Sequence, residues 1–471
     1  MYYFIGIKGS GMSALASILY DLGYEIKGSD REEHYFTEDG LRARNIEISP
    51  FDENNIKEGM VIIKGNAFNE SNPEVKKAME LGLTIHTYQE MVAKLTKMFK
   101  TITVAGCHGK TSTTSMLAHT LGKLVGTNYL IGDGTGFANK DNKYFALEAC
   151  EYKRHFLAYT PYYAIITNID LDHVDYFKDI DDVIDAYREY ADNALNMVIA
   201  CGDDRYTHSL SSSISKPIFY YGIDEDNDIL AKDVNYSSNG TSFDVFVEGN
   251  YYGHFDLPIY GKHQLLNSLA VISVCYYERL EAREVAKVLK TFKGAKRRFS
   301  ETIVGSNVVI DDYAHHPAEM RATIKAAKQK YADKDIVVVF QPHTYSRTKE
   351  FAEDYIQLLK TVNYSYILDI HGSRETSGDI SSEDLIREIP NCEHISIDEA
   401  EKLRKYENTV IIFMSPNDIS KLENDYIQHL TTLLFLSNQL KNRLMHILQL
   451  CSSVNKKTTR PMLAHLYYFQ V

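Results

Sequence analysis

Short hydrophobic runs alternate with amphipathic segments along most of the chain. Each run is shorter than a typical helix and is followed by a turn or a helix-like pattern. The runs comprise residues 2–5, 61–63, 102–105, 164–167, 308–310, 336–340 and 410–414. Strands buried on both faces and joined by helices have this pattern, which therefore predicts βαβ units and an α/β fold with parallel sheets.

Three strand-to-helix turns carry distinctive motifs, after Ile5, Ala105 and Ile310, and each is expected to begin a separate sheet. At about 150 residues per domain, the 471 residues also suggest three domains. We predict an N-terminal Rossmann-like domain, a central P-loop ATPase-type α/β domain and a C-terminal Rossmann-like domain. The predicted ranges are residues 1–97, 98–296 and 297–430.

Residues 219–255 depart from the βαβ pattern. Aromatic and β-branched residues alternate there and are interrupted by Asn239-Gly240 and Gly249-Asn250. Such dipeptides favour tight hairpin turns, so we expect an antiparallel insert in the central domain.

Residues 431–471 form an atypical tail of unknown role. Residues 431–450 carry apolar side chains at partly helical spacing, whereas the rest has no pattern. An amphipathic segment usually packs on its own protein, so a helix docked on the third domain is the favoured interpretation. The alternative is a helix for a partner or a membrane surface.

The charge balance limits the classes of partner. Lys and Arg total 51 and Asp and Glu 64, giving a net charge of −13, which disfavours nonspecific attraction to nucleic acid or anionic lipid.

The six cysteines form no CxxC pair, which favours a reducing compartment. Without a signal-peptide pattern or an 18-residue apolar run, we expect a cytoplasmic protein with no membrane span. We also expect a monomer or weak homodimer.

The strongest motif is a phosphate-binding loop between an apolar strand and a helix-like segment. Glycines let the backbone N–H groups and the helix N-terminus face a polyphosphate, a lysine reaches the outer phosphates, and a hydroxyl can bind Mg²⁺. The first glycine of the usual GxxxxGK[ST] pattern is missing, since Val104 occupies that position. The predicted ATP-binding residues here are Gly106, Cys107, His108, Gly109, Lys110, Thr111 and Ser112.

A second glycine-rich loop follows the first strand. Lys8 replaces the second glycine of GxGxxG and adds positive charge next to a helix N-terminus, and Asp30 lies where an acidic residue often meets a ribose. A nicotinamide nucleotide and a nucleotide sugar both suit this pattern. The candidate residues are Gly6, Lys8, Gly9, Ser10, Gly11, Met12, Ser13 and Asp30.

Oxygen-bearing side chains follow two further strands of the central domain. Glu148 and Glu151 lie in EACEYKRHF, and Asn168, Asp170, Asp172 and His173 lie in TNIDLDHVDYF. Oxygen ligands next to a phosphate loop are typical of Mg²⁺ sites. In the third domain, the motifs DDYAHHP and FQPHTYSRT also follow strands, and Arg347 is suited to bidentate binding of a carboxylate.

Eight motifs, in this order and spacing, resemble the Mur ligases over about residues 1–430. They are GIKGSGMS, AGCHGKTSTT, EACEYKRHFL, TNIDLDHVDYF, YGKHQLLN, KRRF, DDYAHHP and FQPHTYSRT. The resemblance is to the branch that joins L-alanine to UDP-N-acetylmuramate, and it implies an ATP- and Mg²⁺-dependent ligase acting through an acyl phosphate in peptidoglycan precursor synthesis. It also implies that the first domain binds the UDP-sugar and that the third closes over the site.

The resemblance assigns further roles to matching residues. It implies catalytic roles for Lys110, His173, His343 and Arg347, and magnesium ligation by Thr111, Glu151 and His173. His263, Asn267, Arg298 and Asp312 would contact ATP. Tyr313, His315, His343 and Arg347 would receive L-alanine.

The chain departs from the family pattern in two places. Sister ligases use a carbamylated lysine after the DH motif, but no lysine occurs between Lys178 and Lys216, consistent with the alanine-adding branch. The usual GAGDI is replaced by residues 415–419, SPNDI, which lack the flexible glycines.

Three alternatives stay open at this point. A ligase that recycles a whole peptide onto the same sugar nucleotide has similar chemistry, although EACEYKRHF favours a single amino acid. A dinucleotide-dependent oxidoreductase would use only the first glycine loop. A nucleotide-binding protein without ligase activity would fit the altered segment near Ser415.

Overall fold

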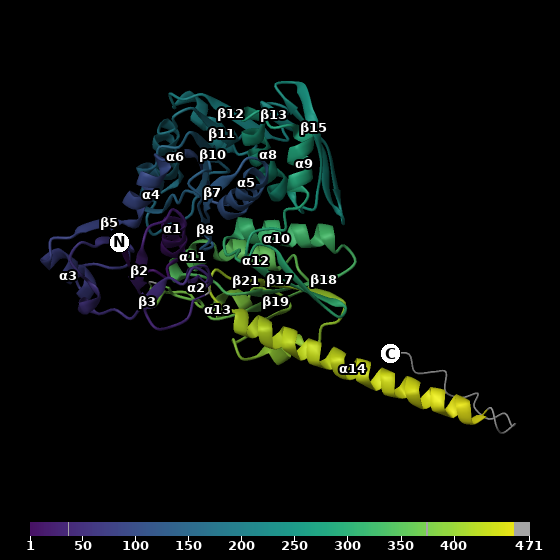
Figure 1. The fold of residues 1–471 in the computed structure, drawn as a ribbon. Coiled ribbons are helices and arrows are strands. Elements are labelled where there is room, and N and C mark those ends of the chain that lie inside the picture. Colours follow the sequence, from purple (N-terminus) through teal and green to yellow (C-terminus); the bar gives the residue numbers. More distant parts are fainter. Residues whose placement is uncertain (36, 374, 456–471) are drawn as a thin grey trace.

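The computed structural model describes residues 1–35, 37–373 and 375–455. Its three sheets each begin near one of the three motif-bearing turns, and the predicted three-domain α/β fold is confirmed (Figure 1). The part of the predicted tail from residue 456 onward lies outside the described residues. Among the described residues, no helix combines the length and the apolar character that crossing a membrane requires.

The N-terminal domain is a five-stranded parallel sheet in the order β3-β2-β1-β4-β5. β1 matches the predicted strand, and its buried side chains Tyr3, Phe4 and Ile5 pack on both faces. The strands are β1 (Tyr2–Ile5), β2 (Ile26–Ser29), β3 (Glu47–Ser49), β4 (Val61–Lys64) and β5 (Thr84–Thr87), and the helices are α1 (Ser10–Asp21), α2 (Glu38–Arg42), α3 (Pro73–Glu80) and α4 (Tyr88–Thr96).

The central domain is built on a ten-stranded sheet in the order β15-β14-β13-β12-β11-β10-β6-β9-β7-β8. The strands are β6 (Lys100–Ala105), β7 (Thr127–Leu130), β8 (Gly136–Phe137), β9 (Tyr144–Glu148), β10 (Tyr163–Ile166), β11 (Met197–Cys201), β12 (Ile218–Gly222), β13 (Ile229–Ser237), β14 (Gly240–Val247) and β15 (Asn250–Leu257). Its α-helices are α5 (Lys110–Leu124), α6 (Ile180–Asp192), α7 (Arg205–Ser209), α8 (Lys262–Tyr277) and α9 (Ala282–Leu289).

The predicted antiparallel insert is present but begins later than expected. β13, β14 and β15 pair antiparallel, with turns at Ser238-Asn239 and Glu248-Gly249. Residues 218–222 instead form β12, which pairs parallel with β11. The start expected at Phe219 was wrong because a buried parallel strand has the same aromatic and β-branched composition as a hairpin strand.

The C-terminal domain has six strands in the order β16-β17-β21-β18-β19-β20, and only β16 pairs antiparallel. The strands are β16 (Ser300–Val304), β17 (Asn307–Asp312), β18 (Asp335–Phe340), β19 (Tyr364–Ile367), β20 (Cys392–His394) and β21 (Thr409–Met414). The helices are α10 (Pro317–Lys330), α11 (Tyr345–Glu350), α12 (Ala352–Leu359), α13 (Ser382–Ile386) and α14 (Ser420–Asn455).

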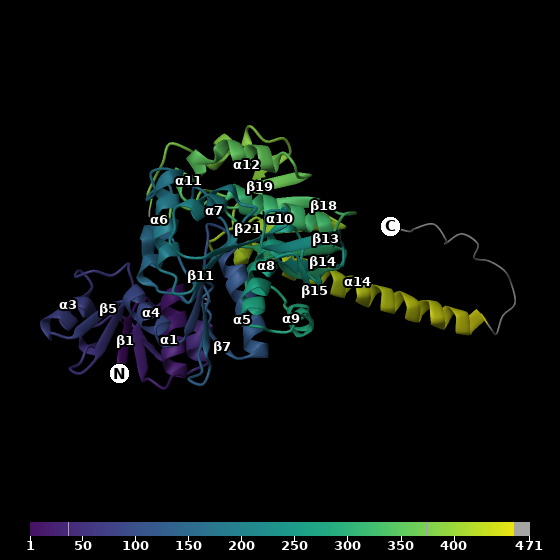
Figure 2. The ribbon, with the colours of Figure 1, turned by 90° about the horizontal axis from the view of Figure 1, so that it is seen from above.

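The long helix α14 crosses the predicted start of the tail at residue 431 without a break. Its first turns pack on the third domain through Leu422 and Tyr426, next to Ile419 just before the helix. Beyond residue 430 it extends away from the rest of the molecule (Figures 1 and 2), and Leu440 and Leu444 are 67% and 62% exposed. Docking of this segment on the third domain, the favoured interpretation of the pattern, was therefore wrong.

The segment that replaces GAGDI forms an ordered turn. The Ser415 hydroxyl accepts a hydrogen bond from the Asn417 amide at 2.9 Å, and the Arg297 guanidinium donates to the Ser415 carbonyl at 2.8 Å. None of residues 415–417 has a positive φ. The turn therefore does not need the conformational freedom of glycine here.

Candidate active site

The phosphate loop connects the carboxyl end of β6 to the N-terminus of α5. Gly106 and Gly109 have φ values of +142° and +83°, in the region that favours glycine. A Cβ at Gly106 would lie 1.9 Å from the Thr167 hydroxyl, and one at Gly109 would lie 2.7 Å from Asn267 Oδ1. Both glycines are therefore required by backbone conformation and by close neighbours, as the sequence predicts.

Lys110, the first residue of α5, points back into this loop. Its ammonium donates to the Gly106 carbonyl at 2.5 Å and lies 2.9 Å from Glu151 Oε2. Burial alone would lower the pKa of Lys110, but Glu151 raises it above its ordinary value. The lysine is therefore a fixed positive charge at the position where the sequence expects phosphate.

Glu151, Asp172 and His173 form a compact cluster next to Lys110. One ligand atom from each lies within 4.8 Å of the others, and Glu151 is 1% exposed. His173 has a φ of +52° and lies 3.5 Å from Glu151. Burial opposes ionisation of both carboxyls, but Lys110 lowers the pKa of Glu151, and His173 and Arg347 lower that of Asp172. Two ionised carboxylates provide the oxygen ligands that a divalent cation such as Mg²⁺ prefers.

Thr111 lies apart from the other two predicted metal ligands. Its hydroxyl donates to Glu148 Oε1 at 3.0 Å, and the other oxygen of Glu148 accepts the Gly132 amide at 2.7 Å. The structure thus places Glu151 and His173 in one cluster with Asp172, whereas Thr111 contacts Glu148 instead. Metal ligation by Thr111, Glu151 and His173 stays a prediction.

The C-terminal domain closes one side of this cluster. Arg347, on α11, donates to Asp172 Oδ1 at 2.5 Å, and both side chains are largely buried. A cavity of about 310 Å³ lies between the two domains. Its lining includes Lys110, Glu148, Glu151, His173, Arg298, Tyr313, His315, His343 and Arg347. The structure therefore brings together all four predicted catalytic residues and all the predicted amino-acid-binding residues.

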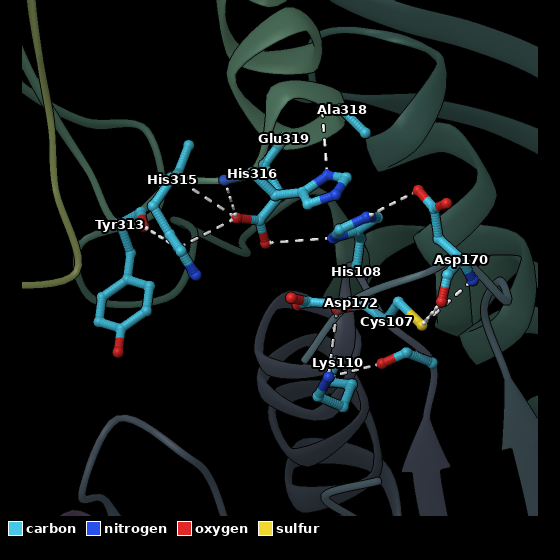
Figure 3. A network of polar contacts seen from close by, with 12 residues as sticks. Cys107, His108, Lys110, Asp170, Asp172, Tyr313, His315, His316, Ala318 and Glu319 are labelled. Atoms are coloured by element: carbon cyan, nitrogen blue, oxygen red, sulfur yellow. Dashed lines mark hydrogen bonds and ion pairs between the residues drawn. The ribbon is translucent and has the colours of Figure 1, made fainter. Parts of the chain in front are cut away.

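A polar network joins the phosphate loop to the start of α10 (Figure 3). His108 lies between Asp170, at 3.3 Å, and Glu319, at 3.6 Å. Burial alone would lower the pKa of His108, but the nearby carboxylates of Asp170 and Glu319 raise it to about 9. His108 is therefore a cation that links two carboxylates from different domains.

His108, Asp170 and His316 also place ligand atoms within 4.8 Å of one another. Burial lowers the pKa of His316 to about 4, so its ring is neutral at pH 7. Its Nδ1 accepts the Ala318 amide at 3.3 Å, which leaves the ring proton on Nε2. A protonated Nε2 is not a metal ligand, so this second cluster is an interdomain contact in the described arrangement.

A second cavity of about 310 Å³ lies on the other side of the phosphate loop. His263 and Asn267, one turn apart on α8, form one wall, and Ala318, Ala322 and Thr323 of α10 form another. Burial lowers the pKa of His263 to about 4 and raises that of Asp312 to about 6. Arg298 and Asp312 also line this cavity, so the predicted ATP contacts meet here.

The first glycine loop has the expected turn, and Lys8 within it forms an ion pair. Gly6 has a φ of +82°, and Gly9 and Ser10 are exposed at the start of α1. Gly11, Met12 and Ser13 belong to α1, where Met12 and Ser13 are buried.

The ammonium of Lys8 lies 2.9 Å from Glu38 and donates to two backbone carbonyls. Asp30 accepts the amides of Lys8 and Arg31 at 2.7 and 2.8 Å. In this arrangement Glu38 offsets the charge of Lys8, and contact of Lys8 with a pyrophosphate stays a prediction. Asp30 likewise holds the loop together in this arrangement, so a ribose contact would compete with these bonds.

Glu319 is the main functional candidate that sequence reasoning missed. It contacts His108, Arg298 and His315 at 3.6, 3.4 and 3.4 Å. It occupies the third position of α10, where its side chain forms a capping box with His316, after Pro317 at the first position. The sequence HHPAE carries that N-terminal helix signal. Because α10 starts soon after β17, this signal places Glu319 near the carboxyl end of β17.

Comparison with known proteins gives matches over most of the described residues. Residues 104–275 match the Mur ligase middle domain, residues 1–100 match a domain described as Mur ligase family, catalytic domain, and residues 297–418 match one described as Mur ligase, glutamate ligase domain.

Solved structures of the same architecture extend this result. UDP-N-acetylmuramate-alanine ligase MurC from Thermotoga maritima is 25% identical with a TM-score of 0.77, covering 92% of this chain and 99% of that one. The murein peptide ligase from Psychrobacter arcticus is 21% identical with a TM-score of 0.68, covering 91% and 98%. MurF ligase from Thermotoga maritima, in complex with ADP, is 18% identical with a TM-score of 0.63, covering 81% and 97%.

One assignment agrees with all of these findings: the three sheets in this order, the phosphate loop that faces acidic side chains, and the matches to three consecutive domain models. This chain belongs to the Mur ligase family.

Proposed function

We propose that this chain is an ATP-dependent ligase that joins L-alanine to UDP-N-acetylmuramate. A carboxylate is a poor electrophile in water, so it first takes the γ-phosphoryl group of ATP and becomes an acyl phosphate. The amine of L-alanine then attacks the acyl carbon, the C–O bond to phosphate breaks, and inorganic phosphate leaves as the amide forms. The amine loses a proton in this step.

One observation carries the proposal: the groups that each step requires face a single cavity from two domains. Lys110 and the Glu151, Asp172 and His173 cluster line the central-domain side. His315, His343 and Arg347 line the other side, where Arg347 already binds a carboxylate, that of Asp172, at 2.5 Å. A lysine beside a cluster suited to a cation on the phosphate side, and a guanidinium on the amino-acid side, suit two anionic substrates.

Lys110 would stabilise the charge that develops on the transferred phosphoryl group. In the described arrangement its partner is Glu151, so it would exchange part of this contact for phosphate oxygens when ATP binds. Arg347 would release Asp172 and hold the carboxylate of L-alanine. Enclosure of the cavity by the C-terminal domain would keep water away from the acyl phosphate, which hydrolyses readily.

Glu151, Asp172 and His173 fit a magnesium ion because both carboxylates are ionised and their ligand atoms converge. Magnesium would offset the repulsion between the substrate carboxylate and the γ-phosphate. UDP-N-acetylmuramate would bind at the first domain, where Gly9 and Ser10 are accessible at the N-terminus of α1. We expect the protein to act in the cytoplasm as a monomer or weak homodimer.

Stepwise omission of substrates tests this function. We expect phosphate release only when UDP-N-acetylmuramate, L-alanine, ATP and Mg²⁺ are all present. Phosphate release that ignored L-alanine would contradict the proposal. Competition of L-alanine with the tripeptide tests the recycling alternative, which the likeness to a murein peptide ligase motivates; preferential incorporation of the tripeptide would favour that function instead.

A further inference from the structure

Helix α10 lies along the central domain over its whole length, not only at its catalytic end. Its first turns bring Glu319 to His108 and Arg298. Its middle turns expose Ala322 and Thr323 to the cavity that α8 bounds on the other side. Further along, Ala326 lies 3.5 Å from where a Cβ of Gly261 would be placed. Small side chains thus let α10 approach the N-terminus of α8 closely.

Gln329, in the last turn of α10, forms hydrogen bonds with the central domain at a point remote from the phosphate loop. Its Oε1 accepts the Gly261 amide at 2.7 Å. Its Nε2 donates to the Ser237 carbonyl at 3.0 Å and the Gly240 carbonyl at 3.3 Å. One side chain of the C-terminal domain therefore binds both the turn of the β13–β14 hairpin and the residue that precedes α8.

The position of Gly261 matters because α8 begins immediately after it. Gly261 has a φ of +82° and caps the helix that presents His263 and Asn267 to the cavity. Ten residues of helix, about 15 Å, separate Gln329 from Glu319 at the other end of α10. The two ends of α10 are thus held to the central domain by different contacts, with the cavity between them.

We propose that Gln329 is a positioning residue that sets the spacing of α8 and α10 and so completes the purine nucleotide site between them. It acts through Gly261 and the hairpin and does not line the nucleotide cavity. This inference rests on the proposed function only in taking the cavity as the ATP site. Loss of this contact between the domains would leave the four polar partners of Gln329, Thr241 Oγ1 included, to water, so the contacts favour the described arrangement.

Calorimetric titration of the full-length protein with ADP and Mg²⁺ tests this role without any turnover. We expect Gln329→Ala to weaken ADP binding about ten-fold, because two interdomain hydrogen bonds of good geometry are lost. In the ligase assay, the same variant should raise the KM for ATP by a similar factor with kcat changed less than two-fold. Gln357→Ala is the matched control, since Gln357 donates only to Glu353 of its own helix.

Gln329→Glu provides a second, isosteric variant. It keeps an acceptor for the Gly261 amide but replaces the donor to Ser237 and Gly240 with a carboxylate that their carbonyls repel, so ADP affinity should fall as in the alanine variant. The thermal midpoints of both variants should stay close to that of Gln357→Ala. Unchanged ADP affinity in either folded variant would overturn the inference. Failure of the wild type to ligate alanine, with ADP binding still dependent on Gln329, would overturn only the proposed function.

Discussion

Lys110 has two roles, because its ion pair with Glu151 stabilises the loop and also keeps a positive charge in the site. Glu151 is almost fully buried, and an isolated carboxylate there would be costly. Lys110 offsets that cost and stays charged, at 2.9 Å from Glu151 Oε2. The pair holds the lysine at the loop until a more strongly charged group, a polyphosphate, competes for it.

Replacement of Lys110 by alanine should therefore abolish ligation while the fold persists. Loss of a cation that stabilises a transferring phosphoryl group typically costs about 10³-fold or more in kcat. Phosphate release measures the effect, and far-UV circular dichroism checks the fold. Lys123→Ala, at the far end of the same helix, where the ammonium contacts only Thr291, should keep wild-type activity. A folded Lys110→Ala variant with full activity would remove the argument from the phosphate loop.

His108 makes interdomain stability depend on pH. Its pKa of about 9 in the folded protein exceeds the value of roughly 6.5 expected in an unfolded chain, because Asp170 and Glu319 flank it. The contribution of His108 to the free energy of unfolding is therefore complete below about pH 6.5 and is lost as the pH rises through about 9, with an upper limit of about 3 kcal/mol.

Denaturant titrations of the wild type and His108→Asn between pH 6 and 9.5 measure this contribution. The difference between the two proteins should be largest near pH 6 and shrink towards pH 9.5. A difference that grew with pH would contradict the assigned ionisation of His108.

At the scale of elements, α14 combines a buried start with an exposed continuation. Tyr426 is 0% exposed and its hydroxyl accepts a hydrogen bond from Asn307 at 3.0 Å, whereas Leu440 is 67% exposed. Packing stabilises only the part of the helix that contacts the sheet. The third domain should therefore not depend on the part of α14 after residue 430.

Deletion of residues 431–471 should leave the thermal midpoint within about 2 °C of the full-length value, because the deleted part of α14 buries little. Tyr426→Ala should instead cost about 3–5 kcal/mol, since it removes a large buried side chain. Leu440→Ala, an exposed substitution on the same helix, is the control and should change stability by less than about 0.5 kcal/mol. A large loss of stability on deletion would show that the extension packs on the domain.

The elements that the sequence predicts best are the buried strands. β1 coincides with its hydrophobic run, and β18 and β21 differ by one residue at the start. A parallel strand buried on both faces needs a continuous apolar run, which is a local signal. The docking of α14 and the start of the hairpin insert were wrong because packing partners and strand direction are not local properties.

At the scale of the whole molecule, the site exists only where two domains meet. The loop glycines, Lys110 and Glu151 were predictable from motif and resemblance, since each lies next to a strand end. The contact of Arg347 with Asp172 joins residues 175 positions apart, and Glu319 bridges the domains from a capping position by its contact with His108. Such pairings depend on domain closure, about which spacing in the sequence carries no information.

The central claim is that the carboxylate of the sugar substrate becomes an acyl phosphate before the amine attacks. UDP-N-acetylmuramate labelled with ¹⁸O in its carboxylate tests this directly. Formation of an acyl phosphate requires one labelled oxygen to leave with the γ-phosphate, so mass spectrometry should find one ¹⁸O per inorganic phosphate released. Unlabelled phosphate, formed at the rate of amide synthesis, would contradict the account.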